Sequence, residues 1–242
     1  MAELRALVAA AGRGTRAGLP YPKTLFPVQG KPILVHIADL LAPYDLRLTV
    51  IVSPVGQEPI RQCLSQHHVA ADLVVQPEAR GMGDAVLRLE QSPAFADNEH
   101  VLLIWGDVPF IQPETVASVV ETHRAQGNDF TFATRMVDSA YTVVSRDAAG
   151  QVTRVIETRE EGVGQPQAGE RDIGLFVFRK TVVFDMLHEE LAGKFGKSTG
   201  EHGFLYIIGH LAARGHKVVA LPVATELDLV SLNSMKDIDA YL

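Results

Sequence analysis

A glycine-rich loop follows the first apolar stretch of the chain. It reads Gly12-Arg13-Gly14-Thr15-Arg16 and comes directly after the apolar run 4–10. Glycines in such a loop let backbone N–H groups approach phosphate oxygens closely. The loop matches neither the P-loop pattern nor the dinucleotide-binding glycine pattern, so by itself it is better interpreted as an ordinary turn. Phosphate binding here therefore needs support from other residues.

Two cations bracket this loop. Arg16 closes it, and Lys23 follows seven positions later, next to Pro22. A guanidinium offers a planar fork to phosphate oxygens, and an ammonium offers a compact point charge. Prolines at positions 20, 22 and 27 stiffen the segment that carries Lys23. Positive charge held in place beside a glycine loop predicts phosphoryl-transfer chemistry.

The spacing of apolar residues predicts the scaffold that positions these groups. Apolar strands alternate four times with helices of about ten residues over 4–125, which predicts an α/β fold with a doubly wound, mostly parallel, Rossmann-like sheet. The strands are expected at 4–10, 46–52, 73–76 and 101–105, and the helices at 32–41, 57–65, 83–91 and 114–125. Loops after three strands, at Gly12, Gln76 and Asp107, are expected to meet at the carboxyl edge of the sheet.

The pattern changes from about residue 128. Further strands are expected at 130–136, 141–145, 152–156, 172–178 and 217–222, and helices at 182–191 and 204–214. The first of these strands, with the hairpin that follows, indicate an antiparallel insertion. The stretch 159–171, rich in Glu, Gly and Gln, is predicted to be a mobile loop, and Ser234 is predicted to cap a closing helix that runs to Leu242.

Composition narrows the class of protein. The 22 Lys and Arg against 29 Asp and Glu give a formal net charge of −7, so no general attraction to nucleic acid or to anionic lipid is expected. Cys63 is the single cysteine, which excludes an intrachain disulfide and a thiolate zinc cage and suits a reducing cytoplasm. Neither a secretory signal nor an apolar run long enough to cross a bilayer is predicted.

Several motifs together resemble one family, the sugar-1-phosphate nucleotidyltransferases. The motifs are Ala9-Ala10-Ala11-Gly12 with Gly14-Thr15-Arg16, then Pro22-Lys23, Pro27-Val28 with Gly30-Lys31-Pro32, Gln76 ahead of Gly81-Met82-Gly83, and Trp105-Gly106-Asp107. Within the family the chain is most similar to the uridylyltransferase domain of the bifunctional N-acetylglucosamine-1-phosphate uridylyltransferases. The resemblance covers nearly the whole chain and is strongest up to about residue 111.

The resemblance implies a role for each matching position. Main-chain groups and side chains of the nucleotide pocket would come from Ala9, Ala10, Gly12, Gly14 and Thr15, with Gln76 and Gly81 at the base. Arg16 and Lys23 would be the catalytic cations on the triphosphate, and Asp107 and Asn233 would hold Mg²⁺. The sugar phosphate would be bound by Tyr141, Thr142, Glu157 and Asp172.

The resemblance also implies the organisation of the chain. It implies a single nucleotidyltransferase domain over 1–242, with a nucleotide-binding half at 1–111 and a sugar-phosphate-binding half at 112–242. No C-terminal left-handed β-helix is expected, because the sequence has no hexapeptide repeats.

The sugar half departs from the family pattern. Asp172-Ile173-Gly174 stands where relatives have Asn-Thr-Gly, Thr142 stands where they have glycine, and Leu205-Tyr206 replaces a Thr-Asp pair. An ionised carboxylate only accepts hydrogen bonds, so an acetamido carbonyl is poorly matched at position 172. A sugar phosphate other than the N-acetylated one is therefore equally compatible with these residues.

Three functions are compatible with these residues. The first is an Mg²⁺-dependent transferase that couples UTP to a sugar-1-phosphate and releases pyrophosphate. The second is a cytidylyltransferase that acts on a polyol or aminoalcohol phosphate. The third is a catalytically silent nucleotide-binding module with a regulatory role.

Overall fold

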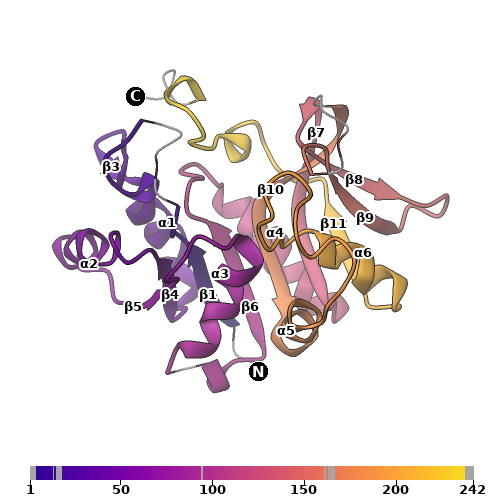
Figure 1. Cartoon of the computed structure of the whole chain (residues 1–242), viewed down its shortest axis with the longest axis horizontal. Coiled ribbons are helices and arrows are strands. Elements are labelled where there is room, and N and C mark those ends of the chain that lie inside the picture. Colours follow the sequence, from indigo (N-terminus) through magenta and orange to yellow (C-terminus); the bar gives the residue numbers. More distant parts are fainter. Residues whose placement is uncertain are drawn as a thin grey trace.

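A seven-stranded sheet forms the centre of the computed structural model, which describes residues 4–12, 14, 18–93, 95–160, 162 and 167–237. The strands are ordered β11-β7-β10-β6-β1-β4-β5 across the sheet (Figure 1). Their bounds are β1 Leu4–Ala9, β4 Leu48–Val52, β5 Ala71–Val75, β6 His100–Trp105, β7 Phe130–Ala140, β10 Gln167–Arg179 and β11 Val218–Leu221. Only β10 runs antiparallel to its neighbours, β6 and β7. The prediction of a mostly parallel α/β sheet is confirmed.

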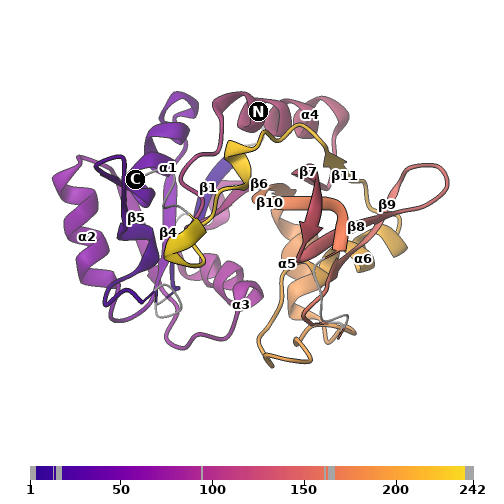
Figure 2. The same cartoon turned by 90° about the horizontal axis from the view of Figure 1, so that it is seen from above.

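Helices cover both faces of this sheet, as the doubly wound prediction requires. They are α1 Ile33–Leu41, α2 Gln57–Gln66, α3 Met82–Leu87, α4 Pro113–Gln126, α5 Lys180–His188 and α6 Tyr206–Ala213. Alternate residues of β1 face opposite ways, because side chains alternate along a strand. Ala6 and Val8 join a core with α1, α2 and α4, whereas Leu7 joins a core with α3, α5 and α6. Figure 2 shows α4 on one side of the sheet and α3 and α5 on the other.

Short elements complete the chain. The small strands β2 Pro27–Val28 and β3 Lys31–Pro32 pair with each other, and the 3-10 helices are η2 Lys23–Leu25, η3 Ala42–Tyr44, η4 Arg88–Gln91, η5 Phe95–Asp97, η6 Leu227–Leu229 and η7 Met235–Asp237. The helix expected over 83–91 is thus divided between α3 and η4. No helix within the described ranges is long and apolar enough to cross a membrane.

The predicted antiparallel insertion is smaller than expected. Among the strands after residue 128, β8 Thr142–Arg146 and β9 Val152–Glu157 form a separate two-stranded sheet, whereas β7 and β10 belong to the central one. The reason is a cluster of five aromatic side chains, each at most 2% exposed, which are buried only when both strands join the main sheet. These side chains are Phe130, Phe132, Phe176, Phe178 and Phe204.

Part of the predicted mobile loop is a strand. β10 begins at Gln167, and its residues 169–172 pair with β7. Glu170 also accepts a 2.7 Å hydrogen bond from Arg146 of β8, so this end of β10 is tied to two elements. The backbone ladder and the ion pair, both formed with residues distant in sequence, explain why local composition was a poor guide here.

The C-terminal segment passes over the carboxyl edge of the sheet, above β1 and β6 (Figure 2). The backbone N–H of Leu232 donates to the carbonyl of Asp107 at 2.9 Å, which ties the segment to the loop after β6. A closing α-helix from Ser234 is wrong for the described part, because 235–237 form the 3-10 turn η7. Residues 238–242 lie outside the described residues.

Candidate active site

Lys23 lies at the start of η2, directly after Pro22. Its ammonium donates to Oδ2 of Asp107 at 2.6 Å and to the carbonyl of Leu232 at 2.8 Å. The side chains of Lys23 and Asp107 are each 20% exposed, so the pair is partly shielded from water. An ammonium has three N–H donors, and two are used here. Within the described ranges, one N–H of Lys23 therefore stays available to an anion.

Gly106 brings the ends of β1 and β6 close together. Its backbone N–H donates to the carbonyl of Ala9 at 3.0 Å, and a Cβ at this position would lie only 2.6 Å from that oxygen. Only glycine allows this approach without displacing the backbone. The loop that carries Asp107 is thereby held beside the glycine loop that follows β1.

The opposite wall is built where two loops meet. The backbone N–H of His202 donates to the carbonyl of Arg80 at 2.7 Å, and that of Gly83 donates to the carbonyl of His202 at 3.0 Å. Gly81 between them has φ +105°, and a Cβ there would lie 2.4 Å from the His202 oxygen. This contact places Glu201 against the turn that contains Gly81.

These segments enclose one pocket of about 420 Å³ at the carboxyl edge of the sheet. Most of the predicted nucleotide and metal residues line it, although they come from five separate segments. The predicted residues in its lining are Ala9, Ala10, Gly12, Gly14, Lys23, Gln76, Gly81, Asp107 and Asn233. The expectation that the loops after β1, β5 and β6 share one crevice is confirmed. Thr15 and Arg16 lie outside the described residues.

The four predicted sugar-phosphate residues do not line this pocket. Tyr141 is 64% exposed, whereas Asp172 is 2% exposed. Thr142 donates its hydroxyl hydrogen to Oδ1 of Asp172 at 2.5 Å, and the N–H of Gly174 donates to Oδ2 at 3.2 Å. Burial raises the pKa of the Asp172 carboxyl above its ordinary value, although these hydrogen bonds and the charge of Arg171 oppose the shift. Asp172 thus links β8 to β10.

Sequence reasoning missed some residues of the pocket. The sequence analysis assigns no role to Met82, Trp105 or Glu201, yet all three line the pocket. The ring of Trp105 also packs at 5.6 Å from that of Phe176. Its position directly before Gly106-Asp107, at the carboxyl end of a strand, was the signal that could have identified it.

Asp107 and Asn233 are suitable ligands for a hard cation. Both line the pocket, and the bond between Leu232 and the Asp107 backbone holds their segments together. The amide nitrogen of Asn233 donates to Ser231 at 2.9 Å, so its oxygen is the atom available to an ion. No cluster of three or more His, Cys, Asp or Glu suited to a metal occurs in the described part of the chain. One carboxylate plus one amide oxygen fits Mg²⁺, which retains water and substrate phosphates as its other ligands.

The fold and the pocket define an α/β domain of the nucleotidyltransferase type, with its ligand site at the carboxyl edge of the sheet. The chain belongs to the family of MobA-like NTP transferase domains, whose model matches residues 6–171. The resemblance to nucleotidyltransferases that the motifs indicated is therefore confirmed.

Individual relatives agree with this assignment. The chain is 29% identical to the bifunctional protein GlmU of Heliobacterium modesticaldum over 95% of its length, and 29% identical to that of Shouchella clausii over 94%. It spans about half the length of these relatives, 49% of each. A crystal structure of a Bacillus anthracis protein, described as a glucose-1-phosphate thymidylyltransferase, matches with a TM-score of 0.78 over 98% of this chain and 93% of that one, at 17% identity. That structure shares the fold.

Proposed function

We propose that the protein is an Mg²⁺-dependent transferase that couples a nucleoside triphosphate, UTP by preference, to a sugar-1-phosphate and releases pyrophosphate. The observation that carries the proposal is the convergence of Lys23, Gln76, Gly81, Asp107 and Asn233 on one pocket. This reaction requires a cation for the phosphates, polar groups that recognise the base, and a carboxylate suited to Mg²⁺.

The chemistry needs charge neutralisation more than proton transfer. An oxygen of the acceptor phosphate forms a bond to the α-phosphorus, the bond from that phosphorus to the bridging oxygen breaks, and pyrophosphate leaves with the electron pair. A phosphate monoester has a second pKa of about 6, so the nucleophile is already ionised near neutrality. Like charges at about 4 Å repel by roughly 4 kcal/mol per pair at an effective dielectric of 20. We propose that the third N–H of the Lys23 ammonium, which has no partner among the described residues, offsets this repulsion.

Asp107 and Asn233 would hold the Mg²⁺. When bound, the ion neutralises phosphate charge and polarises the bonds to the reacting phosphorus. Lys23 is hydrogen-bonded to Oδ2 of Asp107 in the structure, so ion and ammonium would share one carboxylate: it accepts a hydrogen bond from the ammonium and would offer a lone pair to the ion. Leu232 keeps its carbonyl on the ammonium and its N–H on the Asp107 backbone, which holds the two segments in register.

The acceptor site is proposed at the residues that follow β7 and lie on β8 to β10. The Thr142 hydroxyl already donates to Asp172, and Asp172 accepts with both oxygens. This pair offers no hydrogen-bond donor to an acetamido carbonyl. We therefore propose an acceptor without an acetamido group, such as a hexose-1-phosphate, with Tyr141 and Glu157 as further contacts.

Two measurements test the proposal. Thermal shift with each of the common triphosphates and Mg²⁺ reports binding, since a ligand at 100 times its Kd adds about 2.7 kcal/mol. Pyrophosphate release across a panel of sugar-1-phosphates and alcohol phosphates reports turnover. Release with UTP and a hexose-1-phosphate is the expected result. Release only with CTP and an alcohol phosphate would favour the cytidylyltransferase alternative, and binding without release from any acceptor would favour a silent module.

A separate substitution tests the metal-binding role proposed for Asp107. Asp107→Asn should raise the Mg²⁺ concentration needed for half-maximal UTP stabilisation by roughly tenfold or more, because one hard ligand loses its charge. Asp39→Asn is the matched control, since Asp39 is an exposed carboxylate paired with Lys31. Equal Mg²⁺ requirements in the two variants would contradict a metal role for Asp107.

A further inference from the structure

Hydrogen bonds hold both the backbone and the side-chain amide of Gln76. Its backbone N–H donates to the carbonyl of Val52 at 2.8 Å, which extends the pairing of β5 with β4 by one residue. Its amide nitrogen donates to Oδ2 of Asp84 at 2.8 Å and to the carbonyl of Gly81 at 3.0 Å. A carboxylate and a backbone carbonyl are acceptors only, so the nitrogen of the amide must face them.

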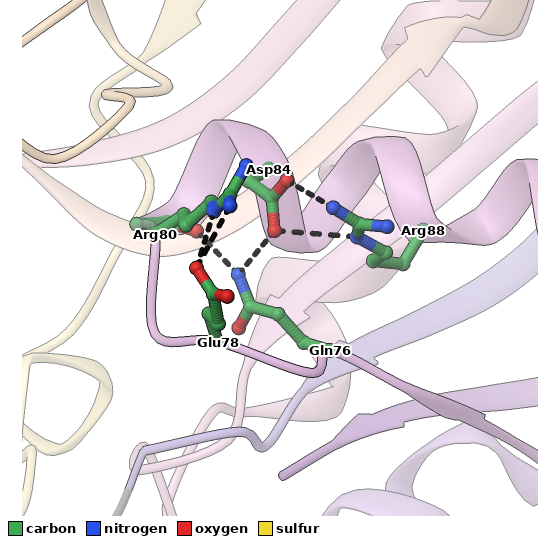
Figure 3. A network of polar contacts seen from close by, with 6 residues as sticks. Gln76, Glu78, Arg80, Asp84 and Arg88 are labelled. Carbon is green, nitrogen blue, oxygen red and sulfur yellow. Dashed lines mark hydrogen bonds and ion pairs between the residues drawn. The ribbon is translucent and has the colours of Figure 1, made fainter.

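Asp84 is in turn held by Arg88, one helical turn further on. Nη2 of Arg88 donates to Oδ1 of Asp84 at 2.5 Å, and Nε donates to Oδ2 at 3.3 Å (Figure 3). Burial by itself would raise the pKa of Asp84, but the hydrogen bonds from Arg88 and Gln76 and the nearby charge of Arg80 outweigh it and hold this pKa below the ordinary value. Asp84 is therefore a carboxylate at neutral pH and has no proton to offer the amide.

The consequence concerns the other atom of the amide. Both N–H groups of Gln76 are used, and Figure 3 shows its oxygen pointing away from Asp84. No residue in the described ranges donates a hydrogen bond to this oxygen, and Gln76 lines the pocket. The side chain can therefore offer a bound base one acceptor and no donor. Uracil and thymine present an N–H at ring position 3, whereas cytosine presents a lone pair there and carries its donor on the neighbouring exocyclic amine. An acceptor opposite ring position 3 therefore distinguishes uracil and thymine from cytosine.

We propose that Asp84, oriented by Arg88, is a positioning residue that fixes the Gln76 amide with its oxygen toward the base, and so selects uracil or thymine over cytosine. The inference rests on the proposed function only in placing the base beside Gln76. It concerns the selectivity of nucleotide binding, which is measurable whether or not a sugar phosphate reacts.

The test compares UTP with CTP in the presence of Mg²⁺. In the parent protein UTP should bind at least about tenfold more tightly, because CTP would set two acceptors against each other. Asp84→Asn replaces the obligate acceptor with an amide that can face Gln76 with either atom, so the preference should fall to within about threefold. Glu78→Gln is the matched control: it removes a charge from the exposed Glu78–Arg80 pair in the same loop, which does not touch the Gln76 amide, and should leave the preference unchanged.

Binding constants by calorimetry, kcat/KM for pyrophosphate release and Tm are measured for all three proteins. A lower Tm with both nucleotides weakened equally would show that Asp84 only supports the fold, and would overturn the inference. So would a parent protein that binds CTP as tightly as UTP. If Asp84→Asn does not fold, Arg88→Gln, which frees the same carboxylate to move, should reduce the preference in the same direction, and an unreduced preference would overturn the inference.

The two proposals can fail separately. Selective UTP binding that Asp84→Asn abolishes, without pyrophosphate release from any acceptor, would support the positioning role and refute the transferase reaction. Release from UTP and CTP alike in the parent protein would support the reaction and refute the positioning role.

Discussion

Replacing Lys23 by methionine separates the two roles that the structure gives this residue. Methionine keeps the length of the side chain and removes its charge. The ammonium bonds to Asp107 at 2.6 Å and to the Leu232 carbonyl at 2.8 Å. A hydrogen bond to a charged group stabilises the fold by about 1.5–3 kcal/mol. The side chains of Lys23 and Asp107 are each only 20% exposed, so screening by solvent removes little of this stabilisation. For a chain of this size the loss corresponds to about 3–12 °C in Tm.

The effect on turnover should be larger. If the free N–H of Lys23 neutralises phosphate charge in the transition state, Lys23→Met should reduce kcat/KM for pyrophosphate release by roughly 10²–10³. Lys31→Met is the control, because Lys31 forms an ion pair with Asp39 at 2.5 Å in which both side chains are well exposed. Such a pair contributes about 0–1 kcal/mol, and the control should keep parental turnover.

Differential scanning fluorimetry and a coupled pyrophosphate assay, run below the Tm of every variant, distinguish the outcomes. Turnover within about threefold of the parent, together with the expected fall in Tm, would show that Lys23 only joins two segments. That result would refute the assignment of the phosphate-binding cation.

Three further predictions concern other parts of the fold. Gly81→Ala should lower Tm by about 2–10 °C and weaken nucleotide binding, because φ is +105° and the new Cβ would lie 2.4 Å from the His202 carbonyl; an unchanged Tm would contradict this contact. Because burial raises the pKa of Asp172, its stabilising protonated form is lost as pH rises. The Tm of Asp172→Asn minus that of the parent should therefore increase as pH rises from 4 to 8. A Tm difference that stays constant over this range would argue against a destabilising buried charge at Asp172. Burial, reinforced by the charge of His100, lowers the pKa of His123 from 6.5 to about 4. The unfolded chain then binds a proton that the folded protein excludes, so the free energy of unfolding should fall by about 3 kcal/mol as pH drops across this window; urea titrations with a flat response would contradict it.

Much of the nucleotide half could be predicted, because its signals are local. The glycine loop, Lys23, Gln76 and Asp107 each follow a short apolar strand or stand next to a proline, and parallel strands bring their carboxyl ends to one edge. The meeting of the loops at Gly12, Gln76 and Asp107 at one edge of the sheet was predicted from topology alone. Asn233 was found only through a motif, since nothing in its neighbourhood indicates that the C-terminal segment crosses that edge.

The second half was harder to predict, because sheet membership there depends on distant partners. Nothing within 167–171 shows that this stretch pairs with β7, and its polar composition favours a loop. The aromatic cluster that draws β7 and β10 into the central sheet includes Phe204, which lies 74 positions after Phe130 in the sequence. Local periodicity does not reveal such an association.

The sequence by itself determined the class of the protein: its order of strands and helices, its glycine loop and the residue types available for phosphate and metal. Tertiary structure decided how those residues are used. It pairs Lys23 with Asp107 across 84 positions and hydrogen-bonds the Thr142 hydroxyl to Asp172. It also orients the amide of Gln76 so that the nitrogen bonds to Asp84 and, among the described residues, the oxygen is left for a ligand. The physical reason is that hydrogen-bonding capacity belongs to a residue type, whereas the atoms left unpaired depend on which neighbours folding brings within about 3 Å.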